Sequence, residues 1–198
     1  QWDRYKFKTE LLASLKSNDT AEALEFPVDR SLSADFQSVL NKKVRLSGSY
    51  DYDHELIIMN RKHASGPGYW LLTPLRIEGS DRAVIVSRGF IPFADSTPES
   101  WKKYRFSNTE SFNAVVQPTV PDRWGVVPSK SGESPNTGWH TRWLYPDIEK
   151  IAKQLPYPVI TAVFLQHLGG PPSGIFPAED ISVDVPPSTH FGYTFEWI

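Results

Sequence analysis

YWLLTPLRIEGSDRAVIVSRGFIP, residues 69–92, contains two apolar runs, 69–77 and 83–87, that flank the turn-like segment 78–81. The second run contains three consecutive β-branched residues, 84–86, whose restricted χ1 angles favour a strand over a helix. A Gly-containing loop between two such runs is typical of a β-hairpin. The first run is apolar on both faces, which predicts a strand covered on both sides. We therefore place this hairpin at the centre of the fold.

Upstream of the hairpin, residues 43–52 alternate in polarity with a period of two. Even positions are apolar, aromatic or Gly, whereas odd positions are Lys, Arg, Ser or Asp, as expected of a half-exposed strand. A polar turn at 51–54 leads to a partner strand at 56–60, and a polar, Gly-containing loop at 61–68 leads to the hairpin. The pattern predicts four strands in meander order.

Downstream, Pro146 at a helix start and apolar residues at helical spacing predict a helix over 146–155. Residues 117–143 are rich in Pro, Gly and Trp and show no period, and such a long loop is uncommon unless it is functional or covers the core. The remaining predictions are helices at 2–16 and 33–40, a short helix beginning near Ser96, Pro98 and Glu99, and strands at 112–116, 159–165 and 181–185.

Composition indicates one folded unit over residues 1–198. An apolar fraction of 39% can build a core, and 17 Pro with 12 Gly favour short elements and many turns. No internal linker or repeat divides the chain. The predicted fold is α+β: a twisted, mainly antiparallel sheet of six or seven strands, curling towards a barrel, with two or three short helices packed on it.

Several classes of function are disfavoured. A formal charge of −2 with well-mixed signs argues against a nucleic-acid surface. The absence of Cys excludes disulfides, thiolate metal sites and a Cys nucleophile. The sequence contains no G-x-S-x-G elbow, H-E-x-x-H, P-loop or dinucleotide-binding glycine motif, so nothing in it supports an enzyme. No apolar run approaches the ~18–20 residues of a membrane-spanning helix.

Two candidate polar sites lie near the predicted sheet. The segment DYDHE, 51–55, could bind a hard cation or act as the acid–base group of a hydrolase through Asp51, Asp53 and His54. Asp is also a preferred turn residue, so a purely structural turn is the alternative. Arg88 before Gly89 could bind a carboxylate or propionate, because the guanidinium bonds bidentately and Gly permits close backbone approach. A structural ion pair is the alternative for Arg88.

Aromatic residues define two further candidates. Trp124, Trp139 and Trp143, with His140 and Arg142, could form an aromatic ligand platform or could fill a β core. In the terminal run HFGYTFEW, 190–197, His190 could ligate haem iron or lie at a membrane surface, and Tyr193 and Trp197 resemble an interfacial aromatic belt.

These segments together resemble the surfeit locus protein 1 family, assembly factors of haem–copper cytochrome c oxidase. The resemblance is carried by VRLSGSYDYDHELII (44–58), GYWLLTPLR (68–76), VIVSRGFIP (84–92), WLYPDIEKIAKQL (143–155), PVITAVFLQ (158–166) and HFGYTFEW (190–197). The order and spacing of these blocks match the family over nearly the whole chain.

The resemblance implies an extracytoplasmic domain between two transmembrane helices, which would precede Gln1 and follow Ile198. The domain would face the periplasm, or lie on the mitochondrial inner membrane in a eukaryote. It implies a non-enzymatic role in maturing the catalytic subunit of the oxidase. The expected partners are that subunit or other assembly factors. Some bacterial members are proposed to bind and deliver haem a, and the family's candidate haem ligand corresponds to His190.

The resemblance also implies that Arg88 could face a haem propionate or a partner carboxylate, with Tyr193 and Trp197 at the partner or membrane interface. The alternative function is an extracytoplasmic β module, unrelated to oxidase assembly, that holds a small ligand with its aromatic loop.

Overall fold

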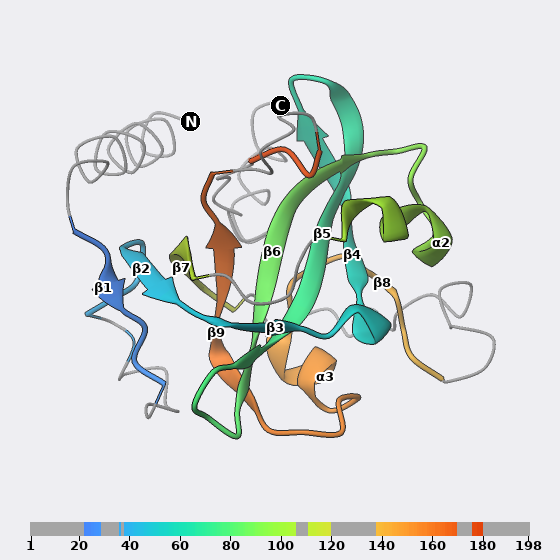
Figure 1. Cartoon of the computed structure of the whole chain (residues 1–198). Helices are drawn as coiled ribbons and strands as arrows, with labels where there is room; N and C mark the ends of the chain where they lie inside the picture. Colours follow the sequence, from blue (N-terminus) through green and yellow to red (C-terminus); the bar gives the residue numbers. More distant parts are fainter. Residues whose placement is uncertain are drawn as a thin grey trace, which may run out of the picture.

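Nine strands form one continuous sheet in the part of the chain that the structure describes (Figure 1). The computed structural model describes residues 22–28, 36, 38–105, 111–119, 138–169 and 176–179. Its elements are β1 (Leu24–Glu25), β2 (Lys43–Leu46), β3 (Gly48–Tyr50), the 3-10 helix η2 (Tyr52–His54), β4 (Leu56–His63), β5 (Gly66–Ile77), β6 (Ala83–Pro92), α2 (Pro98–Trp101), the 3-10 helix η3 (Lys102–Tyr104), β7 (Phe112–Pro118), β8 (Arg142–Trp143), α3 (Ile148–Ala152) and β9 (Val159–His167).

The strand order is β1-β2-β7-β9-β6-β5-β4-β8, and β3 pairs with β5 outside this path. Five of the eight pairings are antiparallel, and three (β1 with β2, β4 with β8, β6 with β9) are parallel. The prediction of an α+β fold with a mainly antiparallel sheet is confirmed. The sheet has more strands than the six or seven expected, and within the described ranges it does not close into a barrel.

The predicted hairpin is confirmed as β5 and β6, which pair from Gly68 with Pro92 to Arg76 with Ala83, with a one-residue register shift between Leu71 and Leu72. Both strands are almost wholly buried. On β5, Trp70 and Leu72 pack into one apolar cluster, whereas Leu71 and Leu75 pack into clusters on the other side. Covering on both faces explains why the sequence of this strand is continuously apolar.

The prediction of one strand over 43–52 is wrong in its pairing. The inward positions of the alternation are buried as expected. However, the strand divides at Ser47, so that β2 pairs with β7 and β3 pairs with the second half of β5. The segment therefore crosses from one part of the sheet to another, and the meander holds only for β4, β5 and β6. Alternation predicts which face a residue takes but not which strand lies beside it.

Two other predictions need correction. The expected loop 61–68 is instead the end of a second hairpin, in which Arg61 pairs with Gly68 and His63 with Gly66. The helix predicted at 146–155 is confined to α3, with Asp147 as its N-cap. The short helix after β6 is confirmed as α2, although Thr97 caps it.

The strand predictions at 112–116 and 159–165 are confirmed as β7 and β9. Within the segment 33–40, Phe36 and Val39 are buried and Leu40 is partly buried. The predictions for 2–16 and 181–185, half of the segment 33–40 and most of the segment 117–143 lie outside the described residues. Among the residues that the structure does describe, no helix has the length and apolar character needed to cross a membrane.

Candidate functional site

Arg88 and Glu55 form a buried ion pair at the middle of the sheet. Arg88 lies on β6, and Glu55 lies between η2 and β4. The Nη1 of Arg88 donates to Oε1 of Glu55 at 2.8 Å, and the two side chains are 0% and 2% exposed. The Nη2 of Arg88 donates to the backbone carbonyl of Tyr104 on η3. Burial of a charge requires such compensation, so this contact explains why Arg88 can occupy a central strand.

Two further side chains hold the Glu55 carboxylate. Arg105, just after η3, donates from both Nε and Nη2 to Oε2 at 3.2 Å, and Thr73 on β5 donates to Oε1 at 3.3 Å. Burial raises the pKa of Glu55, and the opposing attraction of Arg88 and Arg105 does not fully cancel that effect. Glu55 thus joins β4, β5, β6 and the η3 segment at one point.

Aromatic rings surround these guanidinium groups. The Cζ atom of Arg88 lies 5.4 Å from the ring centre of Tyr50 and 5.1 Å from that of Tyr52. The Cζ atom of Arg105 lies 5.1 Å from the same Tyr52 ring. Cation–π contacts of this kind stabilise a guanidinium in a partly dehydrated place. The Tyr52 ring therefore contacts both guanidinium groups.

A half-open cleft of about 140 Å³ lies beside this cluster, between η2, the α2–η3 segment and residues 138–141. One wall of the cleft is formed by α2, whose first turn is held by hydrogen bonds between neighbouring residues. Thr97 and Ser100 form a capping box with Pro98 in the first turn, an arrangement that fixes the start of a short helix. The residues lining the cleft include Tyr52, Asp53, Glu55, Trp101, Arg105 and Trp139.

Hydrogen bonds fix the aromatic walls of the cleft. The indole Nε1 of Trp139 donates to the Glu55 carbonyl at 3.0 Å, and that of Trp101 donates to the Asp95 carbonyl at 2.9 Å. The Asp95 carboxylate also accepts from Lys103 at 2.6 Å and from the Tyr104 hydroxyl at 2.5 Å. The α2–η3 segment is therefore held to the sheet through both its backbone and its side chains.

The acidic segment 51–55 is brought together only in part. Asp51 accepts from the Tyr157 hydroxyl at 2.5 Å and lies 2.7 Å from Nδ1 of His54. Burial raises the pKa of Asp51, but the hydrogen bonds from Tyr157 and His54 outweigh it, so the pKa is lowered. The Asp53 backbone N–H donates to Oδ1 of Asp51 at 3.1 Å, and Asp53 itself lines the cleft.

This arrangement does not match the expected hydrolase group. Asp51 and His54 are not among the residues lining the cleft that Asp53 reaches. Within the described residues, no group of three or more His, Asp or Glu side chains is placed to hold a metal ion. Asp51 caps η2, which supports the structural-turn interpretation.

Trp139 and Trp143 pack in the same apolar cluster as Trp70 and Phe90, which favours their interpretation as core residues. His140 and Arg142 form hydrogen bonds that attach their segment to other parts of the chain. The backbone N–H of His140 donates to Oε1 of Gln154, and Nη1 of Arg142 donates to the Ser96 carbonyl. Trp124 lies outside the described residues.

The sequence model of the SURF1 family matches residues 1–198. The chain belongs to the SURF1 family. It is 26% identical over 167 residues to Surfeit locus protein 1 of Mus musculus, covering 77% of this chain and 51% of the mouse protein. It is 27% identical over 174 residues to a SURF1-like protein of Caenorhabditis briggsae, covering 77% of this chain and 52% of that protein.

A yeast relative carries a functional name. The chain is 27% identical over 153 residues to the cytochrome oxidase assembly protein SHY1 of Saccharomyces cerevisiae, covering 76% of this chain and 38% of the yeast protein. The chain spans about half the length or less of these relatives.

The other predicted site residues of this SURF1-family chain divide into two groups. Arg88 is paired with Glu55 and covered by protein, so contact with a propionate or partner would require that pair to open; this role stays a prediction. His190, Tyr193 and Trp197 lie outside the described residues, and their roles stay predictions.

Sequence reasoning missed Arg105 and did not single out Glu55 within the acidic segment. One signal was available, because a Glu directly before the apolar run 56–58 must find a partner if that strand is buried.

Proposed function

We propose that this SURF1-family domain takes part in the assembly of haem–copper cytochrome c oxidase. The observation that carries the proposal is the family match over residues 1–198, combined with the name of the yeast relative, cytochrome oxidase assembly protein. The finer form of the proposal is that the domain assists maturation of the catalytic subunit, directly or with other assembly factors. It would act at the membrane, from the periplasmic side or on the mitochondrial inner membrane.

The proposed role is non-enzymatic docking. The charged residues at the centre of the sheet are engaged with one another, since Glu55 binds Arg88, Arg105 and Thr73. Such a network holds a surface in a fixed shape. The cleft beside it has aromatic walls and a guanidinium, both of which are common where proteins bind each other.

Haem a delivery is a separate, finer proposal. The cleft of about 140 Å³ is much smaller than pockets for drug-sized ligands, roughly 300–1,000 Å³, so it does not fit haem. Arg88, buried against Glu55, does not fit a propionate in this arrangement. The haem proposal therefore rests on His190 as an axial ligand, which the family resemblance supports.

Deleting the gene in the source organism tests the assembly role. We expect less assembled oxidase on native gels and lower oxidase activity, with normal transcripts of the oxidase subunits, and recovery when the gene is restored. Normal assembled oxidase in the deletion strain would refute the role.

The haem proposal is tested on the full-length protein with His190→Ala. Loss of Soret-region absorbance on copurification or titration with haem a would support ligation by His190. Unchanged absorbance rules this ligand out, and it leaves the assembly role standing.

A further inference from the structure

Arg105 has a hydrogen-bonding edge that none of the residues described by the structure uses. Its Nε and Nη2 donate to Glu55, and Nη2 also donates to the Tyr52 carbonyl at 2.7 Å. Its Nη1 makes no hydrogen bond with any residue in the described ranges. The side chain is 33% exposed, and it lines the cleft. The cleft thus offers a guanidinium that is already held in position.

The charges at the floor of the cleft, formed by the lining residues Glu55 and Arg105 with Arg88 buried behind them, are unbalanced. Two guanidinium groups, of Arg88 and Arg105, share one carboxylate, of Glu55, which leaves one net positive charge. Arg88 and Glu55 are buried, so solvent screens this charge poorly. The floor therefore favours an anion.

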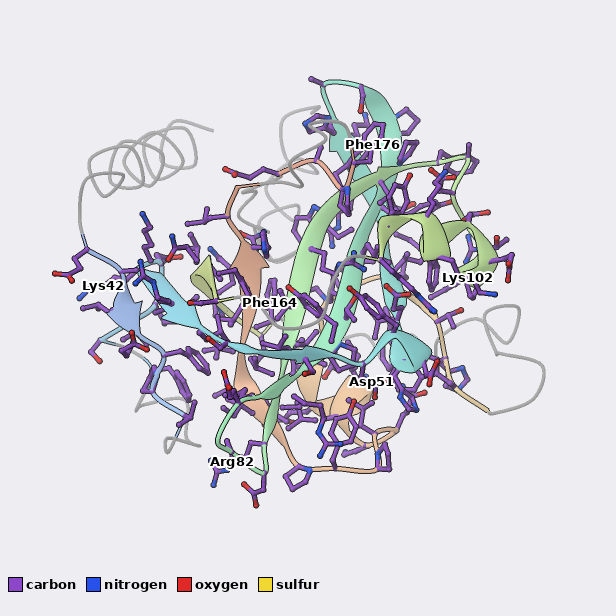
Figure 2. The ribbon with its side chains drawn as sticks, viewed as in Figure 1. Lys42, Asp51, Arg82, Lys102, Phe164 and Phe176 are labelled. Atoms are coloured by element: carbon purple, nitrogen blue, oxygen red, sulfur yellow. The ribbon has the colours of Figure 1, made fainter. Side chains whose placement is uncertain are left out.

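The rim of the cleft carries charges of both signs. Lys102 pairs with Glu99 at 2.7 Å, but these side chains are 56% and 79% exposed, and Asp53 is also exposed. Exposed pairs contribute little and separate readily, so Lys102 can turn to an incoming anion at low cost. Figure 2 shows Lys102 beside the green α2–η3 segment, and Lys102 lines the cleft. The carboxylates of Asp53 and Glu99 are exposed and screened by solvent, whereas the guanidinium of Arg105 is the less exposed charge that a ligand inside the cleft would meet.

Size and openness limit that ligand further. A cleft of about 140 Å³ holds a carboxylate and a few carbon atoms but not a large cofactor. Because the cleft is partly open to solvent, the rest of the ligand would remain outside. The walls of Tyr52, Trp101 and Trp139 suit the methylene groups of a short side chain.

We propose that this cleft binds the carboxylate of a Glu or Asp side chain from a partner polypeptide, through Arg105 with help from Lys102. This inference goes beyond the proposed function and does not depend on it. The occupant is a carboxylate attached to a larger chain, because only its end fits inside. Charge-assisted bonds to a fixed guanidinium would give it orientation as well as affinity.

The test uses full-length protein labelled with ¹⁵N-tryptophan, because the indole N–H of Trp139 lies in the cleft wall. Its signal is assigned with Trp139→Phe. We expect N-acetyl-glutamate amide to shift this signal saturably, whereas N-acetyl-glutamine amide leaves it unchanged. Arg105→Gln should weaken the affinity about fivefold or more, and Lys102→Gln about twofold.

Lys62→Gln is the matched control, since it removes one positive charge from an exposed position on β4, away from the cleft. It should leave the affinity unchanged. Equal shifts with the glutamine probe, or equal weakening by Lys62→Gln, would overturn the carboxylate site. Acetate binding as tightly as the glutamate probe would overturn the polypeptide source. If Arg105→Gln fails to fold, the affinity of Lys102→Gln for the glutamate probe becomes the test, because Lys102 is exposed. An unchanged affinity in Lys102→Gln would then overturn the proposal.

Discussion

The guanidinium of Arg88 lies 2.8 Å from the carboxylate of Glu55, although 33 residues separate them in the chain. Both side chains are buried, and the pair connects the centre of the sheet to the cleft through Arg105. A buried pair is costly to break from one side only, because the remaining charge is left without compensation.

We expect Glu55→Gln to lower the free energy of unfolding by about 3–5 kcal/mol. This change leaves Arg88 buried without a counter-charge. Arg88→Met should cost less, because Glu55 keeps Arg105. Urea unfolding followed by circular dichroism measures both. Equal losses in the two variants would contradict the asymmetry of the network.

Gly89→Ala should be strongly destabilising. Gly89 has φ +130°, and an added Cβ would lie 2.4 Å from the carbonyl oxygen of Ala178. The group that approaches Gly89 is the protein's own chain at Ala178, which forms a bridge with Phe90; the approach of a ligand at Gly89 stays a prediction. We expect a loss of about 3 kcal/mol or more in thermal or urea unfolding.

The matched control is Gly79→Ala, at φ +75° with nothing within 4 Å of the added atom. It should cost only about 1 kcal/mol from backbone strain. A similar loss at both positions would mean that the contact with Ala178 is not the cause.

His167 should make stability depend on pH. Burial, aided by the positive charge of Arg88, lowers its pKa from 6.5 to about 4. The unfolded chain therefore binds a proton more readily than the folded chain between these values. Stability is fully present above pH 6.5 and falls as the pH drops through this window.

The loss between pH 7.5 and pH 5 should be about 1–2 kcal/mol. His167→Gln should remove this part of the pH dependence, and the difference between the two proteins in urea titrations at each pH measures it. Identical pH profiles would show that His167 titrates normally in the folded state.

Tyr157→Phe removes the hydroxyl that donates to Asp51 at 2.5 Å. That bond helps to lower the pKa of Asp51, so its contribution is present above the ordinary Asp pKa and is lost as the pH falls through the folded value. We expect a cost of about 1–2 kcal/mol at pH 7 that shrinks in acid. Tyr145→Phe, which loses no hydrogen bond of the described structure, is the control. A cost that is constant down to pH 3 would exclude the link to Asp51.

The sequence predicts the hairpin β5–β6 well because its information is local. Apolar runs covered on both faces, with a Gly turn at Gly79, leave few other structures open. The start of helix α2 is likewise predicted locally, from Pro98 and its neighbours, and Thr97 caps it.

The partners of these elements were less predictable. Nothing in the alternation of 43–52 tells that β2 joins β7 while β3 joins β5. In the same way, Arg88 alone cannot show that its counter-charge is Glu55 rather than a ligand. Ion pairing and strand pairing depend on which distant segments meet, and a single sequence records that only weakly. The roles of the terminal residues His190, Tyr193 and Trp197 remain predictions.

β9 has a consequence for how the chain is made. It lies between β7 and β6, yet it is the last of the described strands in sequence. Until residue 167 has left the ribosome, the facing edges of β7 and β6 are both unpaired, and the segment through β2 and β3 is the main link between the two sets of strands. Open strand edges attract other chains. The nascent protein therefore has a vulnerable period that ends only when β9 is inserted, and chaperones acting during translation or export would matter most for variants that weaken that step.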